Sequence, residues 1–457
     1  MTLGDSMSRM TIGVWLEEDW NPEEGGGYTF HQALIDAIDR HEFANAKVVF
    51  VTAAQVPLKF SKPVIRVLND EPSKSLLSEE VARSVSDENT RRRLFPLHAI
   101  ADPLRKAWSK LVRLAPCAVT NYVRRVTKGV EASIPSRAQR IETALAELVA
   151  SKKIDVFYFP IPQHEPVNFD NRAAGIPYIS SLWDLGHVST FAFPEFSYNG
   201  SWAWRDNWSR RIPSQALFVI CESESGKREA LSYLNLCPQK VGVVPFFLPR
   251  RPASAPGGSR AGTILDSIGV SAENFFFYPA QFWPHKNHFG LLAAFTEVIK
   301  TNPSLRLVLT GAEKGSFGHV RDCAHSLGVA GNVVFGGFLD NDSVTALYRN
   351  AIALVMPTFL GPTNLPLLEA MLNNCPVICS DFPGHREMLG EAAFYVDPTD
   401  RKGLADAMTR VLVTETRHRQ KALLLEQQRN SHFTAGAAMM AIDGLLPRIE
   451  AVRRCWS

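Results

Sequence analysis

The sequence predicts an α/β protein built from two doubly wound parallel-sheet domains that face each other across a cleft. Short β-branched and aromatic runs alternate with longer amphipathic stretches, which is the rhythm of strand–helix units around a parallel sheet. This rhythm starts twice, near residue 11 and again near residue 275. The length fits as well, since 457 residues with 46% hydrophobic content can bury two cores.

The first domain is predicted to span residues 1–250. Its expected strands are 11–16, 48–51, 154–159, 178–180, 217–220 and 241–245. A loop with Gly25, Gly26 and Gly27 follows the first strand, and a helix is expected from about Thr29 to Arg40. Glycines in such a loop let the backbone approach a ligand without a Cβ clash, and a flexible turn is the alternative interpretation.

A charged segment with a helical pattern, at about 73–151, interrupts the first domain. Basic residues recur from Arg91 to Lys128 between apolar ones such as Phe95 and Trp108. One interpretation is a patch that rests on anionic lipid headgroups. The other is an inserted helical pair whose charged faces are solvated.

The second domain is predicted to span residues 251–435. It follows a connector at 250–262 that is rich in Pro, Ala, Ser and Gly, and its expected strands are 275–278, 305–309, 333–335, 353–356 and 377–379. Residues 436–457 are expected to form a C-terminal helix that packs back on the first domain. Ligands are expected in the cleft, where strand C-termini meet helix N-termini.

Composition narrows the class of protein. The chain contains 49 Lys and Arg residues and 46 Asp and Glu residues, which gives a formal charge of +3. This balance of charges does not predict nucleic acid as a partner. The seven cysteines form no CxxC pair, which fits a reducing compartment. No apolar run approaches the ~20 residues that span a bilayer. A cytoplasmic location is therefore expected, with peripheral contact to the inner face of the membrane left open.

The most informative segment is Pro357 to Asp381, PTFLGPTNLPLLEAMLNNCPVICSD. Pro366 fits the first turn of a helix that follows a strand, so the backbone N–H groups of Thr363 to Leu365 are expected at a helix N-terminus in the cleft. Free N–H groups and the helix dipole favour a phosphate there. Glu369, one turn on, is expected to accept ribose hydroxyls, and a helix-dipole role is the alternative.

These residues resemble the GT-B glycosyltransferases of the group 1 family, retaining family 4, over about Phe275 to Leu412. PTFLGPTNLPLLEA is similar to the family's E-x7-E segment, in which Glu369 takes the place of the second glutamate and Gly361 that of the first. The subgroup with GPTN here includes transferases that build bacterial surface polysaccharides. The resemblance implies that the donor is bound by Glu369 and by the loop residues Pro362, Thr363, Asn364 and Leu365.

A second matching element is the loop Tyr278 to His288, YPAQFWPHKNH. Lys286 resembles the family's phosphate lysine, whose charge neutralises the β-phosphate as the glycosidic bond lengthens. The family's arginine five residues earlier is replaced by Gln281, which brings hydrogen bonds but no charge. By the same resemblance, Gly311 belongs to the donor site and Phe338 lies near the nucleobase.

The first domain resembles the family less strongly. In LWDLGH, Trp183 stands where many relatives carry a histidine, and Asp184 stands at the place of the neighbouring aspartate. His187 is a candidate to share charge or a proton with the acceptor, with a backbone-bonded loop histidine as the equally weighted alternative. Gly26 and Gly27 are implied to approach the donor or acceptor.

The resemblance implies a glycosyltransferase that moves a hexose, from GDP-mannose or a similar donor, to a saccharide or lipid-linked acceptor with retention. No Asp-x-Asp pair stands out as a metal site, so metal independence and no cofactor are expected. Two other classes stay open. A nucleotide-sugar epimerase would need acid and base groups around C2 of the sugar, and a catalytically silent homologue acting as a partner subunit would fit Gly361, Gln281 and Trp183.

Overall fold

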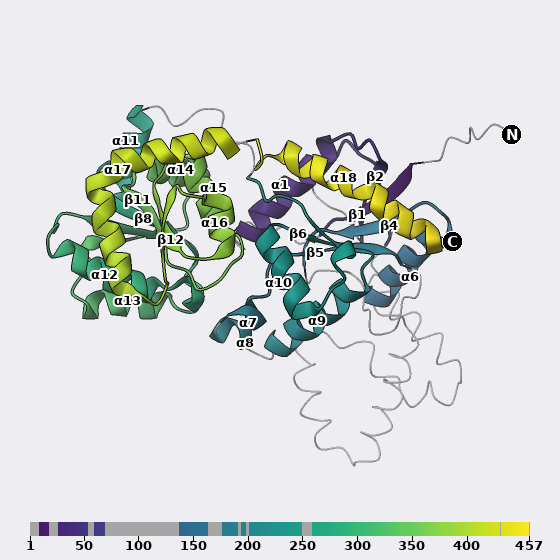
Figure 1. The fold of residues 1–457 in the computed structure, drawn as a ribbon, viewed down its shortest axis with the longest axis horizontal. Coiled ribbons are helices and arrows are strands. Elements are labelled where there is room, and N and C mark those ends of the chain that lie inside the picture. The colour runs from purple at the N-terminus through teal and green to yellow at the C-terminus, as the bar shows by residue number, and fades with distance from the viewer. Residues whose placement is uncertain are drawn as a thin grey trace, which may run out of the picture.

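The structure is a computed structural model that forms two lobes, each around its own parallel sheet (Figure 1). It describes residues 9–17, 26–53, 59–68, 137–162, 176–190, 193–197, 201–248, 258–429 and 431–456. Most of the expected insertion, 73–136, lies outside the described residues. Its last part is helix α6 (Arg137–Ala150).

The first lobe contains a seven-stranded sheet in the order β3-β2-β1-β4-β5-β6-β7, with every pairing parallel. The strands are β1 (Met10–Trp15), β2 (Ala46–Thr52), β3 (Val64–Arg66), β4 (Val156–Phe159), β5 (Tyr178–Leu182), β6 (Phe218–Cys221) and β7 (Val241–Val243). All six predicted strands are confirmed. The edge strand β3 was not predicted, because three residues are too few to show an alternating pattern.

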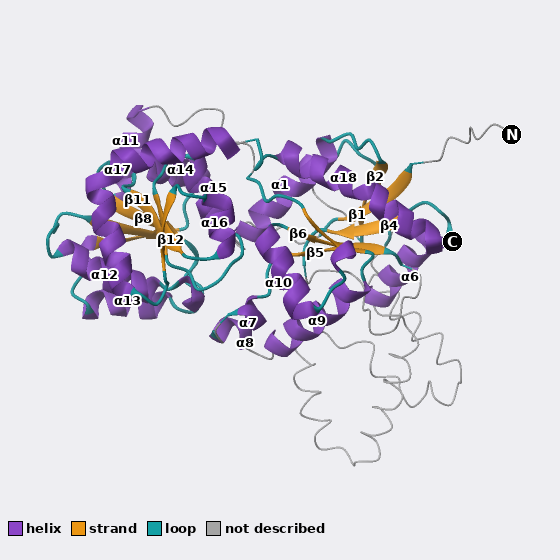
Figure 2. Ribbon diagram, viewed as in Figure 1, coloured by secondary structure: helices purple, strands orange, loops and turns teal. Residues whose placement is uncertain are grey.

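Helices cover both faces of this sheet (Figure 2). They are α1 (Gly26–Arg40), α6, α7 (Gly186–Ser189), α8 (Pro194–Ser197), α9 (Ser201–Gln215) and α10 (Glu224–Leu234). Helix α1 corrects the sequence prediction, because it begins at Gly26 and not near Thr29. Its buried residues Phe30, Leu34 and Ile38 recur every four positions, and this stripe anchors the helix although its first turn contains glycines.

The second lobe contains a six-stranded parallel sheet in the order β10-β9-β8-β11-β12-β13. The strands are β8 (Phe275–Pro279), β9 (Arg306–Thr310), β10 (Val333–Gly337), β11 (Ala353–Met356), β12 (Val377–Ser380) and β13 (Ala393–Val396). The helices are α11 (Gly258–Ile268), α12 (His288–Ile299), α13 (Phe317–Ser326), α14 (Asn341–Asn350), α15 (Leu365–Leu372), α16 (Pro383–Leu389) and α17 (Arg401–Arg429). The prediction of two doubly wound domains is confirmed.

Both sheets reverse their strand order at a central pair, β1 and β4 in the first lobe and β8 and β11 in the second. Helices that follow the two central strands leave toward opposite faces, so a crevice opens beyond the carboxyl ends of that pair. Chain segments after β8 and β11 therefore occupy the position where α/β proteins bind ligands.

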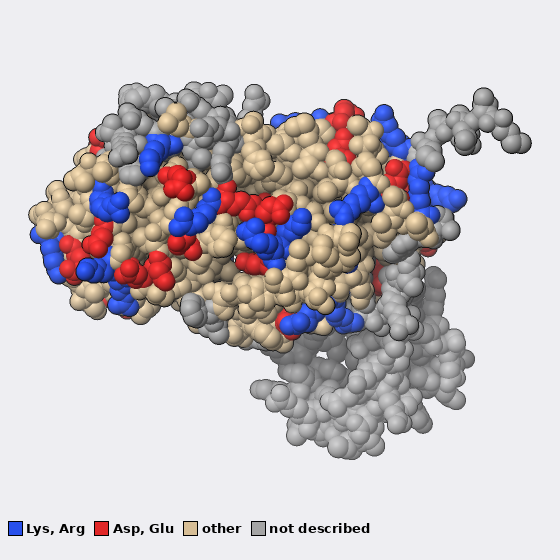
Figure 3. Space-filling view, viewed as in Figure 1, with Lys and Arg blue, Asp and Glu red and all other residues tan. Residues whose placement is uncertain are grey.

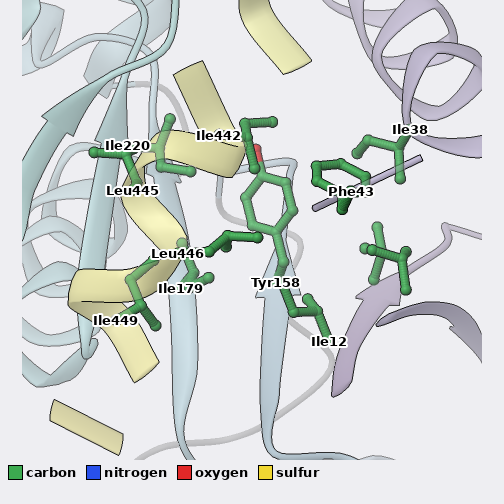
Figure 4. A pocket seen from close by; sticks show the side chains of 12 residues that line it. Ile12, Ile38, Phe43, Tyr158, Ile179, Ile220, Ile442, Leu445, Leu446 and Ile449 are labelled. Carbon is green, nitrogen blue, oxygen red and sulfur yellow. The ribbon is translucent and has the colours of Figure 1, made fainter. Parts of the chain in front are cut away.

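Helix α18 (Ala435–Arg453) returns to the first lobe, where it lies beside α1 (Figure 1). Asp443 accepts hydrogen bonds from the backbone N–H groups of Ala44 and Asn45 at 2.9 and 3.0 Å. The Arg453 guanidinium donates to the carbonyl oxygen of Asp155 at 2.7 Å. Figure 4 shows the small apolar cavity between this helix and the sheet, lined by Ile12, Tyr158, Ile220, Ile442, Leu446 and Ile449 among others.

We predict that Leu446→Ala lowers the free energy of unfolding by about 2–4 kcal/mol, because it removes a fully buried side chain and enlarges an existing apolar cavity. Met440→Ala on the same helix is the matched control, since Met440 is 66% exposed. Urea unfolding of both variants measures the difference. Equal losses of unfolding free energy in the two variants would show that α18 does not contribute to the core of the first lobe.

No helix in the described ranges combines the length and apolar character needed to cross a membrane. Acidic and basic side chains are interspersed over the face shown in Figure 3.

Candidate active site

A cleft between the two lobes is the candidate site. From the first lobe it is lined by Thr29, Phe30, Trp183, Asp184, Glu195, Phe196, Arg205, Glu222 and Phe246. From the second lobe it is lined by residues that follow β8, β9, β10 and β11. The carboxyl ends of both sheets therefore meet at one cavity, as the two switch points require.

The loop after β8 is fixed by Asn287 at the start of α12. Asn287 adopts a left-handed conformation with φ of 58°, and its Oδ1 accepts from the N–H of Gly290 at 3.1 Å. Its amide nitrogen donates to the carbonyl oxygens of Pro357 and Pro398 at 3.0 and 2.8 Å. The Tyr278 hydroxyl donates to the carbonyl oxygen of Lys286 at 3.0 Å. These bonds join the lysine loop to the end of β11 and orient Lys286 toward the cleft.

Lys286 lines the cleft, and its Nζ donates to Oδ1 of Asn364 at 3.3 Å. Burial lowers the pKa of Lys286 to about 8, although the negative charges of Asp184 and Glu195 act in the opposite direction. A buried ammonium group with a lowered pKa is poised to gain from an anionic ligand, because a phosphate would replace the hydration that burial removes.

The loop after β11 presents a helix N-terminus to the same cleft. Gly361 has φ of 124°, a conformation that favours glycine, and Asn364 is the N-cap of α15. The Asn364 side chain makes no cap hydrogen bond to its own helix. Among the described residues, the backbone N–H groups of Thr363, Asn364 and Leu365 find no acceptor. Three donors and the positive end of the helix dipole thus stay available to an anion.

Two glycines allow close backbone contacts beneath this loop. A Cβ on Gly384, at the start of α16, would lie 1.6 Å from the carbonyl oxygen of Pro362. Gly311 has φ of 139°, and its Cβ would lie 2.5 Å from the carbonyl oxygen of Ala280. The site therefore depends on glycine at both positions, and Gly311 also lines the cleft.

Glu369 lies one turn into α15 and lines the cleft. Its Oε2 accepts a hydrogen bond from the Tyr348 hydroxyl at 2.7 Å. Burial raises the pKa of Glu369, and the Tyr348 hydrogen bond partly offsets the rise. This arrangement holds the carboxyl group at the cleft wall, where hydroxyl groups of a ligand can reach it.

Side chains of the first lobe reach across the cleft at two places. Glu195 Oε1 accepts from the backbone N–H of His285 at 3.0 Å and lies 2.5 Å from His285 Nδ1. Burial raises the pKa of Glu195, but the His285 hydrogen bonds outweigh it and hold the pKa below its ordinary value. The Thr363 hydroxyl donates to Glu222 Oε2 at 3.0 Å. The loops after β8 and β11 are thus tied to the opposite lobe.

Glu222 is a buried carboxyl group in the cleft wall. Burial raises its pKa to about 8, and the negative charge of Asp184 adds to the rise while the Thr363 hydrogen bond opposes it. Its Oε1 is buried without a partner in the described part of the chain. At neutral pH this side chain is therefore a protonated acid that can donate a hydrogen bond.

The other predicted residues take different places. Gln281, Phe338, Pro362 and Asp184 line the cleft, and Phe338 is 64% exposed at its edge. Asp184 Oδ1 accepts from the Gly186 N–H at 2.9 Å, which fixes the start of α7. Gly26 and Gly27 form the first turn of α1, the helix that brings Thr29 and Phe30 to the cleft.

His187 is not among the residues that line the cleft. It is buried against α9, where its Nε2 lies 3.5 Å from the Ser209 hydroxyl and its carbonyl oxygen accepts from Trp202 Nε1 at 2.8 Å. Burial lowers its pKa. This placement corresponds to the structural interpretation of His187 rather than to a side chain that meets an acceptor.

Sequence reasoning placed Glu195, Glu222 and His385 within segments similar to the family but gave none of them a role. Glu222 directly follows β6, and this place at a strand end is a signal that could have indicated it. Nothing local to Glu195 indicates its contact with His285, because the two residues are 90 positions apart. No group of three or more His, Cys, Asp or Glu side chains able to hold a metal ion occurs within the described ranges.

Comparison with known proteins finds a family that is similar to the second lobe. Residues 266–423, which contain the lysine loop and α15, match the family described as Glycosyl transferases group 1. The second lobe is thus similar to the domain of group 1 glycosyltransferases over this segment. The matched segment contains Lys286, the free amides before α15 and Glu369, which lie in one cleft.

Two curated relatives are named as mannosyltransferases. O-antigen chain mannosyltransferase B of Escherichia coli is 23% identical over 219 residues, which covers 47% of this chain and 56% of the relative. O-antigen chain mannosyltransferase RfbU of Salmonella typhimurium is 30% identical over 140 residues, 30% of this chain and 38% of the relative. The matches thus span about half or less of these relatives' length.

The crystal structure of Anabaena HepE in complex with UDP-glucose shares the architecture of the whole chain. It superposes with a TM-score of 0.61 at 15% identity, over 96% of this chain and all of that one. The two lobes therefore form a GT-B fold.

Proposed function

We propose that the chain transfers a hexose from a nucleoside-diphosphate sugar, GDP-mannose or a related donor, to a saccharide or lipid-linked acceptor, with retention of the anomeric configuration. The observation that carries the proposal is one cleft in which the Lys286 ammonium group and the free amides of Thr363 to Leu365 face the same space. A diphosphate matches that set of donors in charge and in hydrogen bonding.

Nine residues form the proposed donor site, and each lines the cleft. Lys286 and the loop amides meet the diphosphate, Glu369 accepts ribose hydroxyls, and Phe338 lies beside the base. The full set is Gln281, Lys286, Gly311, Phe338, Pro362, Thr363, Asn364, Leu365 and Glu369. The UDP-glucose complex of HepE, a protein of the same fold, supports a nucleotide-sugar donor.

In the proposed reaction the bond between the anomeric carbon and the phosphate oxygen breaks, and its electron pair stays on the departing diphosphate. Lys286 and the loop amides stabilise the charge that develops there. The acceptor hydroxyl attacks from the same face and passes its proton to the departing phosphate. Charge neutralisation by protein groups, without a divalent cation, predicts that turnover persists in EDTA.

The acceptor is proposed to bind on the side of the first lobe, where Asp184, Glu195 and Arg205 line the cleft together with aromatic rings of Phe30 and Trp183. The names of the two mannosyltransferase relatives support a role in polysaccharide biosynthesis. The location that corresponds to this role is the cytoplasm, with peripheral contact of the enzyme to anionic membrane.

Release of nucleoside diphosphate from GDP-mannose and other donors, with and without candidate saccharide acceptors, tests the proposal. A transferase releases the diphosphate and forms a new glycoside, whose anomeric configuration is determined by NMR. Conversion of the donor without transfer would identify an epimerase. Binding of the diphosphate without turnover would identify a silent homologue.

The affinity for a nucleoside diphosphate is predicted to fall as pH rises through about 8. The ammonium form of Lys286 binds the diphosphate, and its pKa of about 8 in the free protein means that the neutral amine dominates at higher pH. Since one proton is linked to binding, the dissociation constant should rise by up to about tenfold per pH unit above that value.

Calorimetric titrations from pH 6 to 9.5 measure this dependence. Glu222 has a pKa of about 8 as well, so Glu222→Gln is needed to separate the two groups. The fall in affinity should persist in Glu222→Gln and disappear in Lys286→Arg, because a guanidinium group stays charged over the whole range. A fall that disappears in Glu222→Gln would assign the titration to the carboxyl group.

A further inference from the structure

A fully buried histidine lies directly behind the proposed phosphate site. His385 is in the first half of α16, and none of its surface is accessible to solvent. Its Nδ1 lies 2.7 Å from the carbonyl oxygen of Ser380, and its Nε2 lies 3.0 Å from Nδ2 of Asn364. His385 does not line the cleft, and its hydrogen bond to Asn364 connects it to a residue that does.

These hydrogen bonds determine which atoms of His385 and Asn364 carry hydrogens. A carbonyl oxygen only accepts, so Nδ1 of His385 carries a hydrogen. Burial lowers the pKa of His385 to about 4, so the ring is neutral near pH 7 and its Nε2 accepts. The Asn364 atom that faces Nε2 is therefore the NH2 group, and Oδ1 faces Lys286 Nζ at 3.3 Å.

We propose that His385 is a positioning residue, which orients the Asn364 amide so that its oxygen holds the Lys286 ammonium group in place for the diphosphate. This inference rests on the proposed function, since that function gives Lys286 its ligand. It adds a residue, His385, that acts on the lysine from outside the cleft through two hydrogen bonds.

The orientation of the amide has a direct electrostatic consequence. With Oδ1 toward Lys286, the ammonium group meets a neutral acceptor that leaves its positive charge available to an anion. With the amide reversed, two N–H dipoles would face the ammonium group and repel it. Asp184 and Glu195 are the negative groups around Lys286, and His285 and His288 are its other titratable neighbours.

The same orientation keeps the helix N-terminus free. Asparagine at an N-cap commonly accepts from a backbone N–H of its own helix. The Asn364 side chain makes no such bond, because its NH2 group is held by His385 and lies 3.4 Å from the carbonyl oxygen of Leu360. His385 thus keeps one side chain from capping the amides that the diphosphate is proposed to use.

The first experiment compares His385→Leu with His385→Gln in the full chain by calorimetric titration with GDP and UDP between pH 6 and 9.5. Leucine removes the acceptor for Asn364, so we expect the dissociation constant to rise about tenfold. We also expect the pH at which affinity falls to decrease by about half a unit, because Lys286 loses its acceptor. Glutamine can donate to Ser380 and accept from Asn364, so it should restore both values.

His325→Leu is the control for loss of a histidine, since His325 is exposed near the end of α13. Melting temperatures of all variants show whether they fold. A merely structural role of His385 would lower the melting temperature of His385→Leu without moving the pH at which affinity falls. A folded His385→Leu variant with native affinity and native pH dependence would overturn the inference.

The second experiment does not require binding. Nitrogen and carbon NMR shifts of labelled histidine rings, assigned by loss of a signal in His385→Gln, report which ring nitrogen carries the hydrogen. We expect the Nδ1–H form from pH 5.5 to 9. The Nε2–H form would overturn the inference. Absence of nucleoside diphosphate binding by the native chain would instead contradict the proposed function. The NMR measurement would still test the hydrogen bonds from His385 through Asn364 to Lys286.

Discussion

Lys286→Met is expected to lower kcat/KM for nucleoside diphosphate release by about a thousandfold. The variant removes the charge that meets the diphosphate as the glycosidic bond breaks, and removal of one preorganised electrostatic group in a dry site costs about 10²–10³ in rate. The upper end of this range is expected because Lys286 is the proposed charged partner of the diphosphate leaving group, to which Gln281 contributes no charge. Steady-state kinetics with the preferred donor measures the effect.

Stability separates this effect from misfolding. Burial lowers the pKa of Lys286, so its charge is unfavourable in the folded protein without a ligand. Replacement by methionine should therefore leave the melting temperature unchanged or raise it. Lys300→Met is the matched control, because Lys300 lies just after α12, is exposed and pairs only with Glu297 in the described structure. Retention of full activity in Lys286→Met would contradict the proposed function.

Much of the fold could be predicted from local patterns. Buried parallel strands are continuous apolar runs, such as Phe275 to Tyr278 and Ala353 to Met356, and such runs are visible without knowledge of their partners. The short edge strands β3 and β13 were missed, since three or four partly exposed residues carry no comparable signal.

The positions of the loops after β8 and β11 could be predicted for a physical reason. A helix with Pro366 in its first turn, after a strand and a glycine-containing loop, must present free N–H groups at the sheet edge. A lysine after the neighbouring central strand must lie at the same edge, since β8 and β11 are adjacent. Two local patterns and the topology of one sheet thus bring Lys286 and the α15 amides together.

The contacts between distant segments were not predictable. Glu195 and His285 are 90 residues apart and belong to different lobes, so their meeting depends on how the lobes close. The place of His187 could not be decided from sequence either, since an acceptor-facing side chain and a structural loop histidine were equally compatible with it, and α9 covers it in the structure. Burial of a loop side chain depends on which helix packs over it, and a single sequence does not state that.

Gly384→Ala is expected to damage the donor site although residue 384 itself does not line the cleft. Its Cβ would lie 1.6 Å from the carbonyl oxygen and 2.6 Å from the carbonyl carbon of Pro362, and both atoms belong to the backbone. Neither can move aside as a side chain would, so the loop before α15 must shift. We expect the free energy of unfolding to fall by about 3 kcal/mol, as for overpacking at a rigid contact.

The same shift should weaken nucleoside diphosphate binding by at least about tenfold, because a displacement of the loop moves the amides of Thr363 to Leu365 away from Lys286. Gly318→Ala in α13 is the matched control, since its Cβ meets no atom within 4 Å and alanine should stabilise that helix by about 0.5 kcal/mol. Calorimetric titration and urea unfolding measure both quantities. If Gly384→Ala loses stability but binds GDP or UDP as tightly as the native chain, the contact between α16 and the loop supports the fold alone. If binding weakens as expected, the close contact of Gly384 with Pro362 also positions the loop amides that the diphosphate is proposed to use.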